Sequence, residues 1–176
     1  MQNDMTSETC TSIVENVGSC HNPATESAVE IVDVPGNIKV RGMFRRYLDV
    51  SRWIVFLVSA ADVKRTFKDD AAYLHEIIVA NVERRPILVF CNKSDVDFSE
   101  SKDVVQLLLE KELNKRRVRV ASPGETLKEG EDVLYGDPVE DFHFDQLPMH
   151  VVFGQGSVKN NDIENVWTFL NLTDMK

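Results

Sequence analysis

The chain has 176 residues, 43% of them hydrophobic and 28% charged, a balance typical of a folded domain rather than a disordered segment. Its formal net charge of −9 disfavours nonspecific binding to nucleic acid or to anionic membrane surfaces, so we expect no direct nucleic-acid partner. The three cysteines form no CxxC pair, which favours reduced thiols in a cytosol-facing protein over a disulfide framework.

The sequence shows no sign of a segment that crosses a membrane. The longest apolar run, residues 53–58, is far shorter than the roughly 20 residues that a spanning helix needs. The N-terminus lacks both the basic region and the apolar stretch of a signal peptide. We therefore expect any membrane attachment to depend on an anchor that is absent from this chain.

In chain order, residues 1–27 come first; they are polar, rich in Ser, Thr, Asn and Glu, and predict a flexible or switch-like N-terminal segment. From residue 28 to 172, apolar stretches of strand length alternate with helical patterns. The predicted strands are residues 28–33, 53–59, 86–92 and 149–153, and the predicted helices are residues 40–48, 62–82, 99–116 and 162–172. The continuous apolar run at 53–59 is typical of a strand buried on both faces.

This alternation predicts an α/β domain with a mostly parallel sheet that helices cover on both faces. The pattern is interrupted at residues 117–147, an irregular stretch that contains several glycines and prolines. Because a loop of this length is unusual in a compact domain, we interpret it as a functional or family-specific insertion. We therefore expect one domain over residues 28–172, with an insertion at 117–147.

Candidate site residues follow three of the predicted strands, and in a parallel α/β sheet ligands bind at these carboxyl ends. The first group is Asp33-Val34-Pro35-Gly36, a DxxG motif. An Asp at a strand end can hold Mg²⁺ through water, and the Gly lets a backbone N–H approach a γ-phosphate closely. The motif is weak on its own, because many strands end in Asp and turn at Pro-Gly.

The second group, Asn92-Lys93-Ser94-Asp95, is an NKxD motif directly after a predicted buried strand. Guanine presents two N–H donors on one edge, and the Asp95 carboxylate can accept both and so select guanine over adenine. Asn92 can bond the base or tie neighbouring loops together, and the stem of Lys93 can lie over the ring. An isolated NKxD is often only a polar turn, but its position relative to the DxxG motif favours a small GTPase.

The third group, Gly156-Ser157-Val158-Lys159, lies between the last predicted strand and the last predicted helix. Its loop N–H groups can meet the guanine O6. By itself this signal is very weak, but its order and placement fit the other two motifs.

With these motifs the chain resembles the signal recognition particle receptor beta subunit family, within the Ras/Arf superfamily of small GTPases. The resemblance runs from about Thr11 to Leu170. Its specific parts are Leu-Glu-Lys-Glu-Leu-Asn at residues 109–114 and Phe-x-Phe-x-Gln-Leu-Pro at residues 142–148, because ordinary Ras or Arf proteins lack them. The resemblance implies a P-loop-NTPase-like fold and the ligands GTP and Mg²⁺.

The resemblance also implies roles for individual residues. Thr11, with Ser12 beside it, matches the switch I threonine that reaches Mg²⁺, and Asp33 and Gly36 match the switch II metal and γ-phosphate positions. The implied metal-binding residues are thus Thr11 and Asp33, and no residue is implied to be catalytic. Six residues match the positions that contact the guanine base: Asn92, Lys93, Asp95, Ser157, Val158 and Lys159.

The sequence departs from the family at the phosphate site. No GxxxxGK[ST] motif occurs, although in the family this loop, with a strand before it and a helix after it, precedes switch I. The loop supplies most of the affinity for a charged nucleotide. We therefore expect the chain as given to bind GTP weakly or not at all and to leave strand edges unpaired. A truncated sequence is the preferred explanation, and a natural paralogue without the loop is the alternative.

A second departure concerns hydrolysis. Asn37 stands where Ras-type enzymes have Gln and where the receptor family commonly has His. Asn is shorter than Gln by one methylene, so its amide is not expected to reach the attacking water. We predict weak or no hydrolysis.

The resemblance implies a GTP-regulated binding module. Its GTP-bound form would dock the alpha subunit of the receptor for cotranslational protein targeting at the cytosolic face of the endoplasmic reticulum membrane. Three apolar residues in polar segments, Ile13, Ile38 and Val40, can supply the centre of such an interface. Two alternatives stay open. One is an Arf-like GTPase of vesicle traffic, which the insertion and the Phe-x-Phe-x-Gln-Leu-Pro segment disfavour. The other is a nucleotide-free pseudo-GTPase scaffold, which the missing phosphate loop favours.

Overall fold

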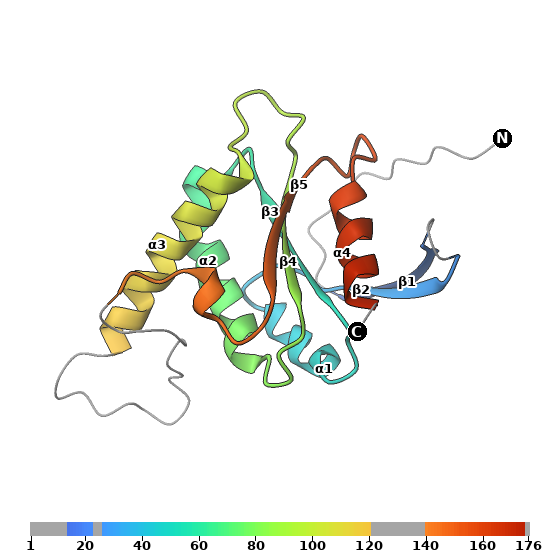
Figure 1. Cartoon of the computed structure of the whole chain (residues 1–176), viewed down its shortest axis with the longest axis horizontal. Coiled ribbons are helices and arrows are strands. Elements are labelled where there is room, and N and C mark those ends of the chain that lie inside the picture. Colours follow the sequence, from blue (N-terminus) through green and yellow to red (C-terminus); the bar gives the residue numbers. More distant parts are fainter. Residues whose placement is uncertain (1–13, 23–25, 121–139, 175–176) are drawn as a thin grey trace. The chain divides into compact units, whose positions relative to one another are not determined.

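The computed structural model describes residues 14–22, 26–120 and 140–174 of the chain (Figure 1). The chain divides into two compact units, Met1–Val50 and Ser51–Lys176. Among the described residues, no helix is both long and apolar enough to span a bilayer.

The first unit contains two antiparallel strands followed by a short helical segment. β1 (Asn16–His21) pairs with β2 (Ala28–Asp33), with Asn16 opposite Asp33 and His21 opposite Ala28. The strand predicted at 28–33 is confirmed, but it pairs with β1 and not with the other predicted strands. The predicted helix at 40–48 consists of a 3-10 turn, η1 (Arg41–Phe44), and a turn of α-helix, α1 (Arg45–Leu48).

Within residues 1–27, which the sequence predicts to be flexible or switch-like, residues Asn16–His21 form the strand β1. Its sequence, Asn-Val-Gly-Ser-Cys-His, has no apolar alternation, and nearly all of its side chains are exposed. The strand is therefore specified by backbone pairing with β2 rather than by a buried face, and this is why the pattern of side chains did not predict it.

The second unit is a parallel three-stranded sheet between helices. β3 (Ile54–Ser59), β4 (Ile87–Asn92) and β5 (Val151–Gln155) run parallel with β4 in the centre. Figure 1 shows α2 (Val63–Ala80) and α3 (Lys102–Val120) on one face of this sheet and α4 (Glu164–Asp174) on the other. The three strands and three long helices confirm the predicted α/β alternation.

The core of this unit is built on β4, whose residues 87–91 are all buried. On the α4 face, Leu88 and Phe90 form a cluster with Phe169 and Leu170. Each side chain of this size contributes about 1.5–3 kcal/mol when it is fully buried. The expectation of a strand buried on both faces is thus right for β4.

The same expectation is wrong for the strand at residues 53–59. Val55 and Leu57 of β3 are 38% and 55% exposed, whereas Phe56 and Val58 on the opposite face are buried. β3 lies at an edge of the three-stranded sheet, and α4 packs on β4 and β5. One face of β3 is therefore largely open, and a continuous apolar sequence did not reveal this.

The insertion predicted at residues 117–147 is not irregular throughout. α3 continues to Val120, and a 3-10 turn, η2, covers Phe144–Gln146. Residues 121–139 lie outside the described part of the chain.

Residues 141–144, near the end of the predicted insertion, are fastened to α3, and a buried glutamate makes the first of these attachments. The Glu110 carboxylate accepts the backbone N–H of Phe144 at 3.2 Å and the Gln106 side-chain amide at 3.0 Å. His143 Nδ1 lies 3.2 Å from the second carboxylate oxygen. Glu110 is only 6% exposed, and these contacts satisfy a charge that burial would otherwise penalise strongly.

One helical turn further along α3, Asn114 extends this attachment. Its side chain donates to Asp141 Oδ1 at 2.7 Å and accepts the N–H of Phe142 at 3.3 Å. The Phe144 ring packs edge-on against Phe142 and against Phe153 of β5, with ring centres 5.4 and 5.1 Å apart. The two family-specific sequence segments are therefore in direct contact.

Candidate nucleotide-binding site

The NKxD loop and the loop at residues 156–159 leave the sheet side by side, because each follows the carboxyl end of one of two neighbouring parallel strands. Gly156 donates its N–H to the Cys91 carbonyl at 3.1 Å, and Ser94 donates its N–H to the Gly156 carbonyl at 3.1 Å. These two backbone hydrogen bonds join the loops at their bases.

Asn92 joins the same loops through its side chain. Its Oδ1 accepts the N–H of Val158 at 3.0 Å and the N–H of its neighbour Lys93 at 2.8 Å. Of the two roles predicted for Asn92, the geometry supports the tie between loops.

Asp95 is held by the neighbouring loop and keeps its carboxylate exposed to solvent. The Ser157 hydroxyl donates a hydrogen bond to it, and this bond is the main reason why the pKa of Asp95 is lower than usual. Ser157 is itself 2% exposed, and its Oγ accepts the N–H of Asn160 at 3.2 Å. An ionised carboxylate only accepts hydrogen bonds, as recognition of two adjacent N–H donors requires.

Lys93 is positioned by a residue that the sequence analysis did not single out. Its ammonium lies 3.5 Å from Asp62 Oδ2, at the start of α2. The Ser59 hydroxyl, at the end of β3, donates to the same oxygen at 2.8 Å and is the largest cause of the lowered pKa of Asp62. The sequence does offer one signal for Asp62: it is an acidic residue just beyond the end of the predicted strand that precedes the NKxD strand.

Gly156 is required by close approach of the backbone. A Cβ at this position would lie 2.1 Å from the Asp162 carbonyl oxygen. Ser157 and Asp162 also exchange backbone hydrogen bonds of 3.0 and 2.9 Å. Any side chain at 156 would therefore displace the loop that holds Asp95.

The residues predicted to contact metal and phosphate lie elsewhere in the chain. Asp33 is the last residue of β2 and is exposed, as is Gly36. Thr11 and Ser12 fall outside the described residues. In the part of the chain that the structure describes, no three acidic, His or Cys side chains gather closely enough to hold a metal ion on their own.

Asn37 is engaged in local structure. Its Oδ1 accepts the N–H of Lys39 at 3.0 Å, and its carbonyl accepts the N–H groups of Val40 and Arg41. The side chain thus caps the helical segment that follows, in addition to being shorter than a glutamine.

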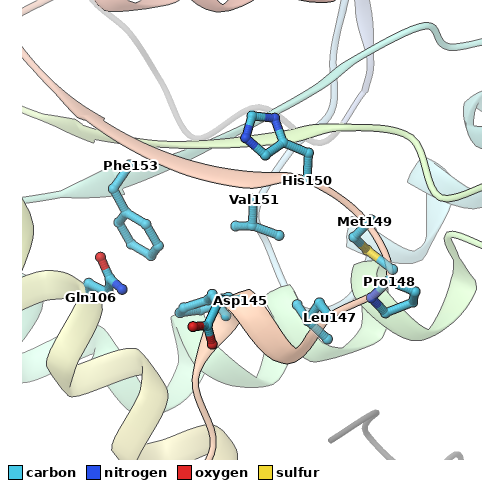
Figure 2. Close-up of a pocket in the computed structure, with 9 residues that line it drawn as sticks. Gln106, Asp145, Leu147, Pro148, Met149, His150, Val151 and Phe153 are labelled. Carbon is cyan, nitrogen blue, oxygen red and sulfur yellow. The ribbon is translucent and has the colours of Figure 1, made fainter.

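A groove of about 590 Å³ lies between η2 and β5, near the amino end of that strand. Figure 2 shows Leu147, Pro148 and Met149 along it, with Asp145 and Gln106 nearby. No nucleophile and base converge among its lining residues, so we assign it no chemistry.

Among known protein classes, a parallel α/β sheet with interlocked NKxD and Gly-Ser-Val-Lys loops defines a small-GTPase-like domain. The family model of the signal recognition particle receptor beta subunit matches residues 1–151. The chain belongs to this family.

Relatives and solved structures agree with this assignment. The human signal recognition particle receptor subunit beta is 31% identical over 82% of this chain, and the Dictyostelium discoideum protein 30% over 95%. The chain spans 58% and 61% of these two relatives. The mammalian receptor structure matches with a TM-score of 0.77 at 29% identity, covering 95% of this chain and 86% of the other. The SRb-GTP/SRX complex from Chaetomium thermophilum, at 21% identity and a TM-score of 0.73, covers 93% and 76% and shares the fold.

Proposed function

We propose that this chain is the guanine-nucleotide-binding part of a signal recognition particle receptor, and that its GTP-bound form docks the receptor alpha subunit. We place this docking at the cytosolic face of the endoplasmic reticulum membrane. The observation that carries the proposal is the interlocking of the two loops, which holds Asp95 ionised and exposed. Family membership and the GTP-bound Chaetomium relative support it.

The loop geometry supports a role for each residue at the base. Asp95 would accept the two N–H donors of guanine, while Lys93, whose ammonium pairs with Asp62, would lay its aliphatic stem over the ring. The N–H of Val158 is already donated to Asn92. We therefore assign the next N–H along the loop, that of Lys159, to the guanine O6, with Ser157 holding Asp95 in place.

Metal and phosphate contacts would come from the residues matched to the switches. Thr11 and Asp33 would hold Mg²⁺, which supplies positive charge at the phosphates when it is bound, and the N–H of Gly36 would face the γ-phosphate. The exposed carboxylate of Asp33 at a strand end suits an ion that keeps much of its water shell.

One sequence observation supports a second candidate function. The 176 residues contain no GxxxxGK[ST] motif. A nucleotide-free scaffold that keeps the fold and docks partners without GTP would not need one. Membership of the receptor family argues against an Arf-like GTPase of vesicle traffic.

Calorimetric titration distinguishes the two candidates. GTP and ATP would be titrated into the chain as given and into a version with an upstream strand, phosphate-binding loop and helix restored (the restored form). We expect weak or no GTP binding by the chain as given, and binding of GTP but not ATP by the restored form. A restored form that folds but binds neither nucleotide would favour the scaffold, and tight GTP binding by the chain as given would contradict our reading of the phosphate site.

A further inference from the structure

The groove between η2 and β5 adjoins a free edge of the three-stranded sheet. β5 is the outer strand in the order β3-β4-β5. The His150 carbonyl accepts the N–H of Ile87 in β4 at 2.9 Å, and backbone direction alternates along a strand. Val151 and Phe153 therefore turn their N–H and C=O groups away from β4, and none of the described residues pairs with them. An extended chain can add to a sheet at such an edge.

The same two residues form the floor of the groove. Figure 2 shows the side chains of Val151 and Phe153 on the η2 side of β5, and the Phe153 ring centre lies 5.1 Å from that of Phe144. Leu147 lines the opposite wall and Gln106 of α3 lies at one end. The groove of about 590 Å³ falls within the range of about 300–1,000 Å³ that is typical of ligand sites. A strand added to β5 would turn every second side chain towards this apolar floor.

The rim of the groove is acidic. Asp145 is exposed, and it is the one Asp, Glu, Lys or Arg among the described residues that line the groove. The net charge of −9 on the whole chain adds to the negative potential there. Both charges favour an occupant that carries Lys or Arg beside Asp145.

The wall of the groove belongs to a segment that nucleotide recognition does not use. Residues 142–148, one of the two family-specific segments, supply Phe144 and Leu147 to the groove. Glu110 and Asn114 fasten this segment to α3 through the N–H groups of Phe144 and Phe142. A wall that is ordered before binding loses less conformational entropy when a partner docks.

We propose that β5 and the adjoining groove dock an extended segment of a protein partner. The segment adds to the sheet as a fourth strand, packs apolar side chains on Val151 and Phe153, and places a Lys or Arg against Asp145. A second copy is disfavoured, because pairing two β5 edges would bring together two acidic rims and two chains of net charge −9. The same charge disfavours an anionic bilayer.

This docking surface does not depend on the proposed function. The groove lies near the amino end of β5, whereas the guanine loops follow the carboxyl ends of β4 and β5. The residues predicted from the sequence for alpha-subunit docking belong to the first unit. Of these, Ile38 is 74% exposed and Val40 is half-buried, and Ile13 lies outside the described residues.

The test uses the seven-residue peptide Thr-Val-Thr-Arg-Thr-Val-Thr with blocked ends, whose Val and Arg side chains share one face when it is extended. It would be titrated into the ¹⁵N-labelled restored form and followed by NMR. We expect saturable shifts of the amide signals of Asp145, Val151 and Phe153. Replacing the arginine of the peptide by glutamate should weaken binding by about threefold or more.

Two doubly N-methylated peptides test strand addition without changing the protein. Methylation of the two valines removes N–H groups from one edge of the extended peptide, and methylation of the two threonines beside the arginine removes them from the other. Only one edge can face β5, so we expect one of these peptides to bind about fivefold or more weakly and the other to change by less than about twofold. Equal effects of the two peptides would overturn the proposal.

Variants of the protein test the same edge from the other side. Val151→Pro removes the outward N–H and keeps the hydrogen bonds between β4 and β5, and it should weaken peptide binding by about three- to tenfold. Val151→Thr keeps that N–H and should change binding by less than about twofold. Asp145→Lys should weaken binding by about threefold or more, and its control, Asp69→Lys at an exposed position of α2, by less than about twofold. Unchanged GTP binding shows that each variant is folded.

The outcomes separate this surface from the proposed function. No saturable shift, or wild-type affinity in both Val151→Pro and Asp145→Lys, would overturn the docking surface and leave nucleotide recognition standing. Peptide binding by a restored form that binds no GTP would overturn the proposed function alone. A dimer in light scattering that Val151→Pro abolishes and the peptide does not dissociate would assign the edge to a second copy instead.

Discussion

Replacing Asp95 by asparagine tests base recognition with the least disturbance of the fold. The carbonyl of an asparagine can still accept the Ser157 hydroxyl that now holds the carboxylate. Towards guanine, however, the amide offers one acceptor where two are needed and places its NH₂ against a donor. Hydrogen bonds to a charged group contribute about 1.5–3 kcal/mol each, so we expect a loss of about 3 kcal/mol, or roughly 100-fold in GTP affinity.

Xanthine carries a carbonyl where guanine carries its amino group, so the same amide becomes complementary to it. In the restored form, Asp95→Asn should therefore exchange a preference for GTP for a preference for XTP, measured by calorimetric titration of both nucleotides. The control is Asp97→Asn, at another exposed acid two residues along the same loop, which should leave both affinities unchanged. If Asp95→Asn bound GTP within about threefold of wild type and gained nothing for XTP, Asp95 would not be the residue that reads the base.

Three further substitutions follow from the geometry. Gly156→Ala places a methyl group against the Asp162 carbonyl and should lower the free energy of unfolding by about 1–3 kcal/mol in urea titrations. The control Gly42→Ala adds a methyl group in open space and should not lower it. Equal effects of the two substitutions would contradict the close approach of the backbone at Gly156. Glu110→Ala leaves the Phe144 N–H without its acceptor and should lower the free energy of unfolding by about 1–3 kcal/mol, against less than about 1 kcal/mol for Asp69→Ala, at an exposed position of α2. If the two substitutions lowered the free energy of unfolding equally, Glu110 would not fasten Phe144 to α3. In the restored form, Asn37→Gln should hydrolyse GTP faster than wild type in single-turnover assays, and wild-type turnover equal to or faster than the variant would refute the role given to Asn37.

The elements that the sequence predicted are those whose own side chains specify them. Residues 87–91 of β4 are continuously apolar and all buried, and α2 carries its apolar residues at helical spacing. β1 was missed because its pairing with β2 uses backbone groups that leave no side-chain pattern. The exposed face of β3 was missed for a related reason: an apolar sequence shows what can be buried but not how far neighbouring elements extend to cover it.

In the candidate site, too, the residues found from the sequence are those that a local pattern specifies. The NKxD and Gly-Ser-Val-Lys motifs were found because their spacing places them at neighbouring strand ends. The contact between Lys93 and Asp62 joins residues whose partnership depends on the side-by-side pairing of β3 and β4, which no local pattern encodes. Likewise, the Phe144 N–H donates to Glu110, which is far away in the sequence. The segments that contain these two residues showed a family resemblance, but neither segment alone indicated that they are in contact.

The central claim is that the two interlocked loops recognise guanine, and an amide NMR titration of the restored form tests it most directly, because it detects binding residue by residue. GTP, GDP and ATP would be added in turn to uniformly ¹⁵N-labelled protein. We predict that GTP and GDP shift the amide signals of Lys93, Asp95 and Lys159, and that ATP at the same concentrations does not. Signals of these loops that stay in place with every nucleotide, or that move equally with ATP, would contradict the account.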